Sequence, residues 1–152
     1  MTEFTAPMTE FTAPMMSITE MEAFLDKEFP QIHMGGRIFS VEAVGHGFCR
    51  MRMAYHERNL RPGGTLSGPS IFALADIAFY VALLGALGPV ALAVTTNLNI
   101  NFLRKPEPRD LIGECRMLKL GKRLAVGEVM LFSEGEEEPV AHVTGTYSIP
   151  PK

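Results

Sequence analysis

The sequence predicts an α+β domain in which a curved antiparallel sheet wraps around one long helix. Residues 71–94 are nearly all apolar, four strand-like segments follow them, and a fifth strand precedes them. A helix that is apolar on nearly every side needs a large surface to bury it. A curved antiparallel sheet supplies that surface, which places the chain in the α+β class.

Length and composition predict one domain of an ordinary kind. The chain has 152 residues, of which 47% are hydrophobic, and its formal net charge is −3. This balance gives no sign of a surface for nucleic acid. Cys49 and Cys115 lie far apart without a metal-ligand pattern, so we expect reduced core thiols in a cytoplasmic protein, with a disulfide as the alternative. No basic segment followed by an apolar one marks a secretory signal.

The first residues are a duplication. Residues 1–14 contain M-T-E-F-T-A-P twice in succession, without an apolar period. We expect a poorly ordered segment that is either a remnant of cloning or an unusual N-terminal extension. The single folded domain is therefore expected over residues 15–152.

A short helix and a strand come next. Residues 17–29 begin with an S-x-x-E capping box at Ser17 and Glu20, show apolar residues at helical spacing, and stop at Pro30. Residues 36–44 are expected as a linker or edge strand. Residues 48–55 alternate between apolar and basic side chains, which predicts a half-buried strand.

The long helix follows a polar loop at residues 56–67, which is marked by glycine and proline. Ser67 or Gly68 can cap the helix, Pro69 fits its first turn, and Gly88-Pro89 ends it after Leu87. The apolar run is long enough to cross a bilayer. Because Asp76 lies inside it and glycines interrupt it, we expect a buried central helix and no membrane span.

Four strands complete the domain. They are predicted from alternating or continuous apolar patterns separated by turns, one of them the Gly-Lys-Arg turn at residues 121–123. The predicted strands are residues 91–103, 110–120, 124–133 and 139–148.

Several of these features together resemble a known family. The matching features are Asn59, the G-T-L-S-G turn at residues 64–68, Asp76, the T-T-N-L-N-I-N-F-L-R segment and the Gly-Lys-Arg turn. Over residues 40–148 the chain resembles the PaaI-like acyl-CoA thioesterases of the hotdog-fold superfamily. In that family the helix begins with His-Gly-Gly, and an acidic residue lies nine positions after the histidine. Here the helix start reads Ser67-Gly68-Pro69, and Asp76 keeps the spacing.

The resemblance implies an active site for thioester hydrolysis. The free N–H groups and the positive dipole of a helix N-terminus stabilise a developing oxyanion. Pro69 cannot donate, so Gly68 is the expected backbone donor. Asp76 would act as general base on water or as nucleophile, and Asn59 would orient water or the thioester. The alternatives are a plain helix cap for Ser67-Gly68, an Asx-turn for Asn59, and a buried, hydrogen-bonded carboxylate for Asp76.

The resemblance also implies the substrate and the assembly. The substrate would be acyl-CoA with a medium-sized aliphatic or aromatic acyl group, and no cofactor or metal is expected. The active site would lie at the boundary of a homodimer or dimer-of-dimers tetramer, with Asp76 of one chain facing Gly68 of the other. Arg104, Lys105, Lys122 and Arg123 are candidates for the CoA phosphates, with ordinary solvated turns as the alternative. The other expected substrate-binding residues are Ser67, Phe72 and Tyr80.

Two competing functions stay open. The replaced histidine and Pro69 motivate a non-catalytic acyl-CoA-binding protein on the same fold. A hotdog dehydratase or hydratase would need a histidine paired with an acidic residue at the helix start, where this chain has Ser67.

Overall fold

The computed structural model describes residues 13–151, so the expectation of disorder over residues 1–14 lies outside them except for its last two residues. The described chain has two α-helices, two short 3₁₀ helices and eight strands. In chain order these are α1 (Ile18–Glu28), a 3₁₀ helix (Pro30–His33), β1 (Phe39–Gly45), β2 (Phe48–Met53), a 3₁₀ helix (Glu57–Asn59), β3 (Leu60–Arg61), β4 (Thr65–Leu66), α2 (Gly68–Leu87), β5 (Val94–Phe102), β6 (Leu111–Leu120), β7 (Leu124–Ser133) and β8 (Ala141–Ser148).

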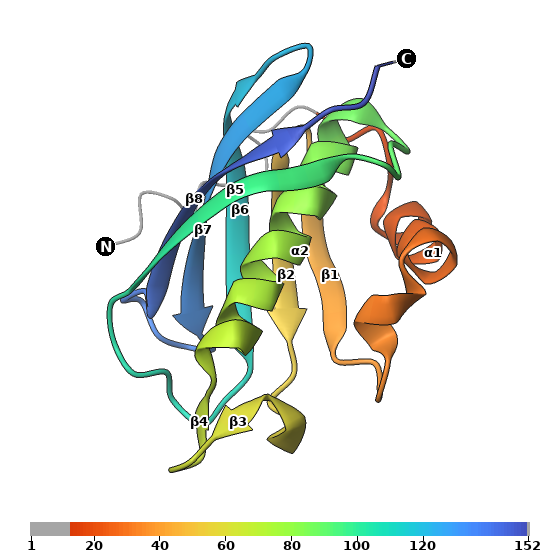
Figure 1. Ribbon diagram of the computed structural model, residues 1–152. Coiled ribbons are helices and arrows are strands. Elements are labelled where there is room, and N and C mark those ends of the chain that lie inside the picture. Colours follow the sequence, from red (N-terminus) through yellow and green to blue (C-terminus); the bar gives the residue numbers. More distant parts are fainter. Residues whose placement is uncertain (1–12, 152) are drawn as a thin grey trace.

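Six strands form one antiparallel sheet in the order β1-β2-β6-β7-β8-β5. The sheet curves around α2, which runs along its concave side (Figure 1). This is the hotdog arrangement, so the predicted fold class is confirmed. β5 lies at one edge of the sheet, where most of its side chains are exposed.

The central helix is long and apolar enough to cross a membrane, yet most of its side chains lie inside the protein. Its Leu74, Leu83 and Leu84 are fully buried. Gly85 allows the helix to lie close to β1, because a Cβ atom there would stand 2.5 Å from the carbonyl oxygen of Gly45. The glycine that interrupts the apolar run is therefore a packing requirement.

A pair of glycines in the sheet makes room for Phe79. Gly127 and Gly145 face each other across β7 and β8, and Cβ atoms added there would lie 3.1 Å and 3.4 Å from the Phe79 ring. The ring also stacks on Tyr147, with 4.6 Å between centroids. The middle of α2 is thus fixed on the sheet by one aromatic side chain.

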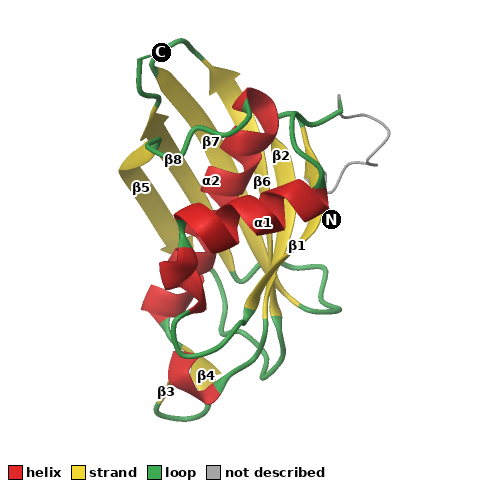
Figure 2. Cartoon of the chain, turned by 90° about the vertical axis from the view of Figure 1, so that its right-hand side faces the viewer, coloured by secondary structure: helices red, strands yellow, loops and turns green. Residues whose placement is uncertain are grey.

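The first helix has the predicted capping box, in which Ser17 and Glu20 each accept a hydrogen bond from the other's backbone N–H. It crosses beside α2 and β1 (Figure 2), and its Met21 and Leu25 are fully buried. The Glu22 carboxylate accepts a hydrogen bond of 3.2 Å from the backbone N–H of Val41. This contact joins α1 to the edge strand β1, which confirms the expectation of an edge strand near residues 36–44.

The two cysteines are free and fully buried, as predicted. They face each other across β2 and β6, and the Cys49 thiol donates a hydrogen bond of 2.9 Å to the carbonyl oxygen of Ala78. Burial raises the pKa of both thiols well above its ordinary value, so they stay protonated core groups.

Candidate active site

The first turn of α2 leaves one backbone donor available. Ser67 is the N-cap, and its side chain accepts a hydrogen bond from the N–H of Ser70. Pro69 has no N–H. Within the described part of the chain, no acceptor takes the N–H of Gly68, which is the first residue of the helix. An N–H at this position carries the positive end of the helix dipole, so it suits an anion or a polarised carbonyl oxygen.

Asn59 lies directly against this helix start. Its backbone carbonyl accepts a hydrogen bond of 2.8 Å from the N–H of Ser67, and its Oδ1 accepts one of 3.0 Å from the Ser70 hydroxyl. Its Nδ2 is buried and has no partner among residues 13–151. A buried amide donor without an acceptor is costly. The arrangement therefore presents a side-chain donor beside the first turn of α2.

The loop that carries Asn59 is more ordered than the polar loop predicted for residues 56–67. It contains the 3₁₀ helix Glu57–Asn59 and the short hairpin of β3 and β4. Arg58 ties it to the preceding segment by donating to the carbonyl oxygens of Met34 at 2.6 Å and Gly36 at 3.3 Å. Side-chain bonds to backbone carbonyls, which the local sequence does not reveal, hold this loop in place.

A cavity of about 700 Å³ opens at the start of α2. The Phe102 ring lies over Gly68, since a Cβ atom on that glycine would meet its ring edge at 3.3 Å. Three cationic side chains line the cavity, and Arg104 forms an ion pair of 2.6 Å with Glu138. The lining residues are Arg61, Pro62, Thr65, Leu66, Gly68, Ile71, Phe102, Leu103, Arg104, Lys105 and Pro106.

Asp76 is held by two side chains that the sequence reasoning missed. The Tyr147 hydroxyl donates to Asp76 Oδ1 at 2.7 Å, and the Thr95 hydroxyl donates to the same oxygen at 2.6 Å. Burial, followed by the charge of Asp76, raises the pKa of Tyr147 well above its ordinary value, so the phenol stays a donor. Since both donors use Oδ1, the other oxygen, Oδ2, keeps its lone pairs for a further partner.

Gly68 and Asp76 do not meet within one protomer. They are eight residues apart on one helix, which separates them by about 12 Å along its axis. Thr95 places Asp76 beside β5, the strand at the edge of the sheet. The structure thus brings Asn59, Ser67 and Gly68 together at one end of α2 and places Asp76 apart from them.

Comparisons with known proteins show the family of the chain. A model of the thioesterase superfamily matches residues 63–140, which include Gly68, Asp76 and β5. The chain belongs to the thioesterase superfamily.

The chain is also similar to solved structures and to curated proteins. A candidate thioesterase from Silicibacter sp. TM1040 has 52% sequence identity and a TM-score of 0.82, over 93% of this chain and 97% of that one. A mutant of the phenylacetic acid degradation protein PaaI from Thermus thermophilus has 26% identity and a TM-score of 0.65, over 74% and 93%. A candidate esterase from Saccharolobus solfataricus is 29% identical over 134 residues, which are 88% of this chain and 86% of that protein.

Tyr80, which was expected to bind the substrate, lies in the core of the protein. It is 5% exposed, its hydroxyl donates to the carbonyl oxygen of Ala91 at 3.0 Å, and its ring packs edge-on against Phe29. It is a core residue because α2 is buried on nearly every side. Phe79, its neighbour on the helix, is also fully buried, whereas Phe72, another residue expected to bind the substrate, is 36% exposed.

Lys122 and Arg123 lie away from Gly68 in the same protomer. They line a separate cavity of about 710 Å³ beside the C-terminal end of α2. Leu87, Pro89 and Ile149 form part of its apolar wall. Arg104 does reach the cavity at the helix start, so the predicted phosphate-binding residues fall into two groups at opposite ends of α2.

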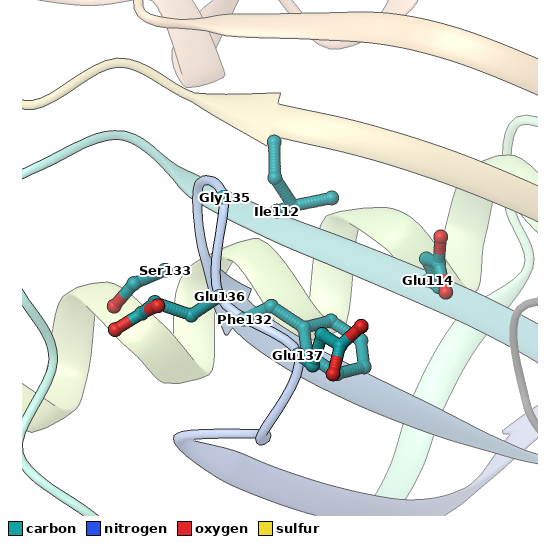
Figure 3. A pocket seen from close by; sticks show the side chains of 7 residues that line it. All are labelled: Ile112, Glu114, Phe132, Ser133, Gly135, Glu136 and Glu137. Atoms are coloured by element: carbon teal, nitrogen blue, oxygen red, sulfur yellow. The ribbon is translucent and has the colours of Figure 1, made fainter. Parts of the chain in front are cut away.

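A third hollow is lined by acidic side chains, whereas cationic side chains line the first two. Figure 3 shows Glu136 and Glu137 on the turn between β7 and β8, with Glu114 farther along β6. Glu114 forms an ion pair of 2.8 Å with Arg50. Carboxylates on the wall of this hollow repel phosphate groups, so it does not suit CoA. No group of three potential metal-ligating side chains occurs in the part of the chain that the structure describes.

Proposed function

We propose that this protein hydrolyses acyl-CoA thioesters to a free carboxylic acid and CoA, as a PaaI-like member of its superfamily. The observation that carries the proposal is the free Gly68 N–H at the start of α2, next to the buried Nδ2 donor of Asn59. Two fixed donors at a helix N-terminus suit the oxyanion of a tetrahedral intermediate, where removing one donor typically costs 10²–10³ in rate, roughly.

The second half of the site would come from another copy of the chain. The separation of about 12 Å between Gly68 and Asp76 along one helix is too long for chemistry through a single water. β5 offers an exposed edge close to Asp76, and its Val94 and Phe102 are 56% and 55% exposed. Pairing two such edges in a homodimer, or in a dimer of dimers, would bring Asp76 of one protomer to Gly68 of the other.

The reaction would proceed by activation of water. Asp76 Oδ2 would accept a proton from water as the water oxygen bonds to the thioester carbon. The carbonyl oxygen would become an oxyanion that accepts from Gly68 N–H and Asn59 Nδ2. The C–S bond would then break, the electron pair would leave on sulfur, and the proton held by Asp76 would pass to the thiolate.

A covalent route uses the same residues. Asp76 would attack the thioester carbon to give an acyl-aspartate anhydride and CoA, and water would then hydrolyse the anhydride. A single turnover in ¹⁸O-water separates the two routes. The anhydride route places ¹⁸O in Asp76 whenever water attacks at the aspartyl carbon, whereas direct attack of water never labels the protein.

The surroundings of the site support an acyl-CoA of medium size. Phe72 and Ile71 offer apolar surface near the helix start. Arg104, Lys122 and Arg123 would bind the phosphates of CoA, and Ser67 would shape the cavity floor as the N-cap.

The chemistry proposed needs no cofactor. Free buried thiols fit a reducing compartment such as the cytoplasm.

A panel of straight-chain and aromatic acyl-CoAs tests this proposal through the release of free thiol. Wild-type protein should turn over at least one medium-sized substrate, and Asp76→Ala should abolish turnover while it retains its fold and its affinity for CoA. A wild-type protein that binds acyl-CoA but never releases thiol would instead be the non-catalytic binding protein that the Ser67 and Pro69 replacements suggest.

A further inference from the structure

A chain of three side chains at the start of α2 has a defined direction. Ser67 Oγ accepts a hydrogen bond of 3.3 Å from the backbone N–H of Ser70 and donates one of 2.9 Å to the Ser70 hydroxyl oxygen. Ser70 Oγ in turn donates a hydrogen bond of 3.0 Å to Asn59 Oδ1. A hydroxyl has a single proton to donate, so each serine donates one hydrogen bond, to the next member of the chain.

The contact between Ser70 Oγ and Asn59 Oδ1 leaves the NH₂ end of the Asn59 amide available. The oxygen and nitrogen of an asparagine amide are told apart by the hydrogen bonds around them. Since Ser70 occupies Oδ1, the NH₂ group is the end left over, and Nδ2 is the buried atom without a partner in the described structure. With the amide turned around, Nδ2 would donate to Ser70 Oγ, and the buried atom without a partner would be the acceptor Oδ1.

We propose that Ser70 is a positioning residue, which fixes the Asn59 amide so that it presents a hydrogen-bond donor to the thioester oxygen. This inference rests on the proposed function and adds a residue to it. Ser70 acts only through Asn59, and Ser67 sets the direction of the Ser70 hydroxyl. Asn59, held by Ser70, therefore supplies a second donor to the oxyanion, in place of the backbone N–H that Pro69 lacks.

The hydrogen-bonded chain from Ser67 through Ser70 to Asn59 is called the relay below. Ser70→Ala interrupts the relay without removing the helix cap, because the backbone N–H of residue 70 still donates to Ser67 Oγ. We expect kcat to fall by about 10- to 100-fold through misorientation of Asn59, with KM unchanged. Ser70→Thr keeps the hydroxyl and should restore most of kcat. Ser17→Ala, a matched change at the cap of α1, should leave kcat at the wild-type value.

Two further measurements separate positioning from simple loss of structure. In an Asn59→Ala background, Ser70→Ala should cause no additional fall in kcat, because its only route of action is gone. In ¹⁵N relaxation measurements, the Asn59 side-chain amide should be rigid in the wild type and gain fast motion in Ser70→Ala. The Asn59→Ala spectrum identifies that resonance.

The outcomes distinguish the relay from the proposed function. A wild-type kcat and a rigid Asn59 amide in Ser70→Ala would overturn the relay while acyl-CoA hydrolysis stands. Equal falls of kcat from Ser70→Ala with and without Asn59 would also overturn it. If the wild type hydrolyses no acyl-CoA, the proposed function fails, and the relaxation of the Asn59 amide alone decides for or against the relay.

Discussion

Replacing Tyr147 with phenylalanine removes a hydroxyl that lies between Asp76 and Thr95. Its single proton is shared between Asp76 Oδ1 at 2.7 Å and the Asp76 backbone carbonyl oxygen at 3.0 Å. The Phe79 ring, stacked on Tyr147 at 4.6 Å, supports a phenylalanine equally well, so no cavity forms. The change therefore measures the contribution of this hydroxyl, whose acceptors both belong to Asp76.

The expected loss of stability follows from the charge of the acceptor. A hydrogen bond to a charged group contributes about 1.5–3 kcal/mol. Because Thr95 still donates to Oδ1 at 2.6 Å, we expect the lower half of that range. For a domain of this size the midpoint of thermal unfolding should fall by roughly 2–4 °C per kcal/mol. A less constrained Asp76 should also lower kcat by about tenfold.

Urea unfolding at matched protein concentration, together with kcat for the best acyl-CoA substrate, measures both effects. The matched control is Tyr80→Phe, which removes a hydroxyl bonded to the neutral carbonyl of Ala91 in the core. It should cost only about 0.5–1.5 kcal/mol and leave kcat unchanged. If Tyr147→Phe altered kcat no more than Tyr80→Phe does, the idea that Tyr147 orients Asp76 would be wrong.

Three further predictions test the packing, the protonation and the substrate site. Gly85→Ala should destabilise the fold by about 1–3 kcal/mol through overpacking, since its Cβ would meet the Gly45 carbonyl oxygen at 2.5 Å; an unchanged urea midpoint would contradict this. The raised pKa of Tyr147 means that the native phenol stays protonated where the unfolded one ionises. Its contribution is therefore complete below about pH 10 and is lost as the pH rises further, by about 1.4 kcal/mol per pH unit. Tyr147→Phe should flatten the fall of unfolding free energy above about pH 10 by that amount, and an identical slope in both proteins would refute the assignment. Replacing Lys122 and Arg123 together by glutamine should raise KM for acyl-CoA about tenfold through loss of charge-assisted phosphate contacts. The same variant should keep KM for the matching acyl-pantetheine, and an equal rise for both substrates would exclude a phosphate-binding role.

Local signals were sufficient to predict most of the fold. Ser67 and Pro69 mark the start of α2 and Gly88 marks its end, because capping chemistry acts within a few residues. The strand predicted from residue 91 begins at Val94 instead, since a turn closed by the Ala93 N–H and the Val90 carbonyl precedes it. The short hairpin of β3 and β4 was missed because two-residue strands carry no alternation.

Only those residues of the candidate site that are related by their spacing along the chain could be predicted from the sequence. Gly68 and Asp76 share one helix, so their separation is a local property of the sequence. Tyr147 and Thr95 reach Asp76 from 71 and 19 residues away, and a tyrosine on an inward strand position is typical of core packing. Tyr80 was predicted to bind the substrate but lies in the core. A helix that is buried on nearly every side has apolar residues on every face, so its sequence does not show which face borders a cavity.

Subunit complementation tests the central claim most directly, since the claim is that each active site combines Asp76 of one protomer with Gly68 and Asn59 of the other. Asp76→Ala protein, which should be inactive, and Asn59→Ala protein, which should be slower by roughly 10²–10³-fold, are unfolded together and refolded as an equal mixture. Statistical pairing makes half of the dimers mixed, and each mixed dimer contains one intact site, so about a quarter of the wild-type activity should return. Activity that stays at the level of the separate variants, in a mixture shown to contain mixed dimers, would contradict a site shared between protomers.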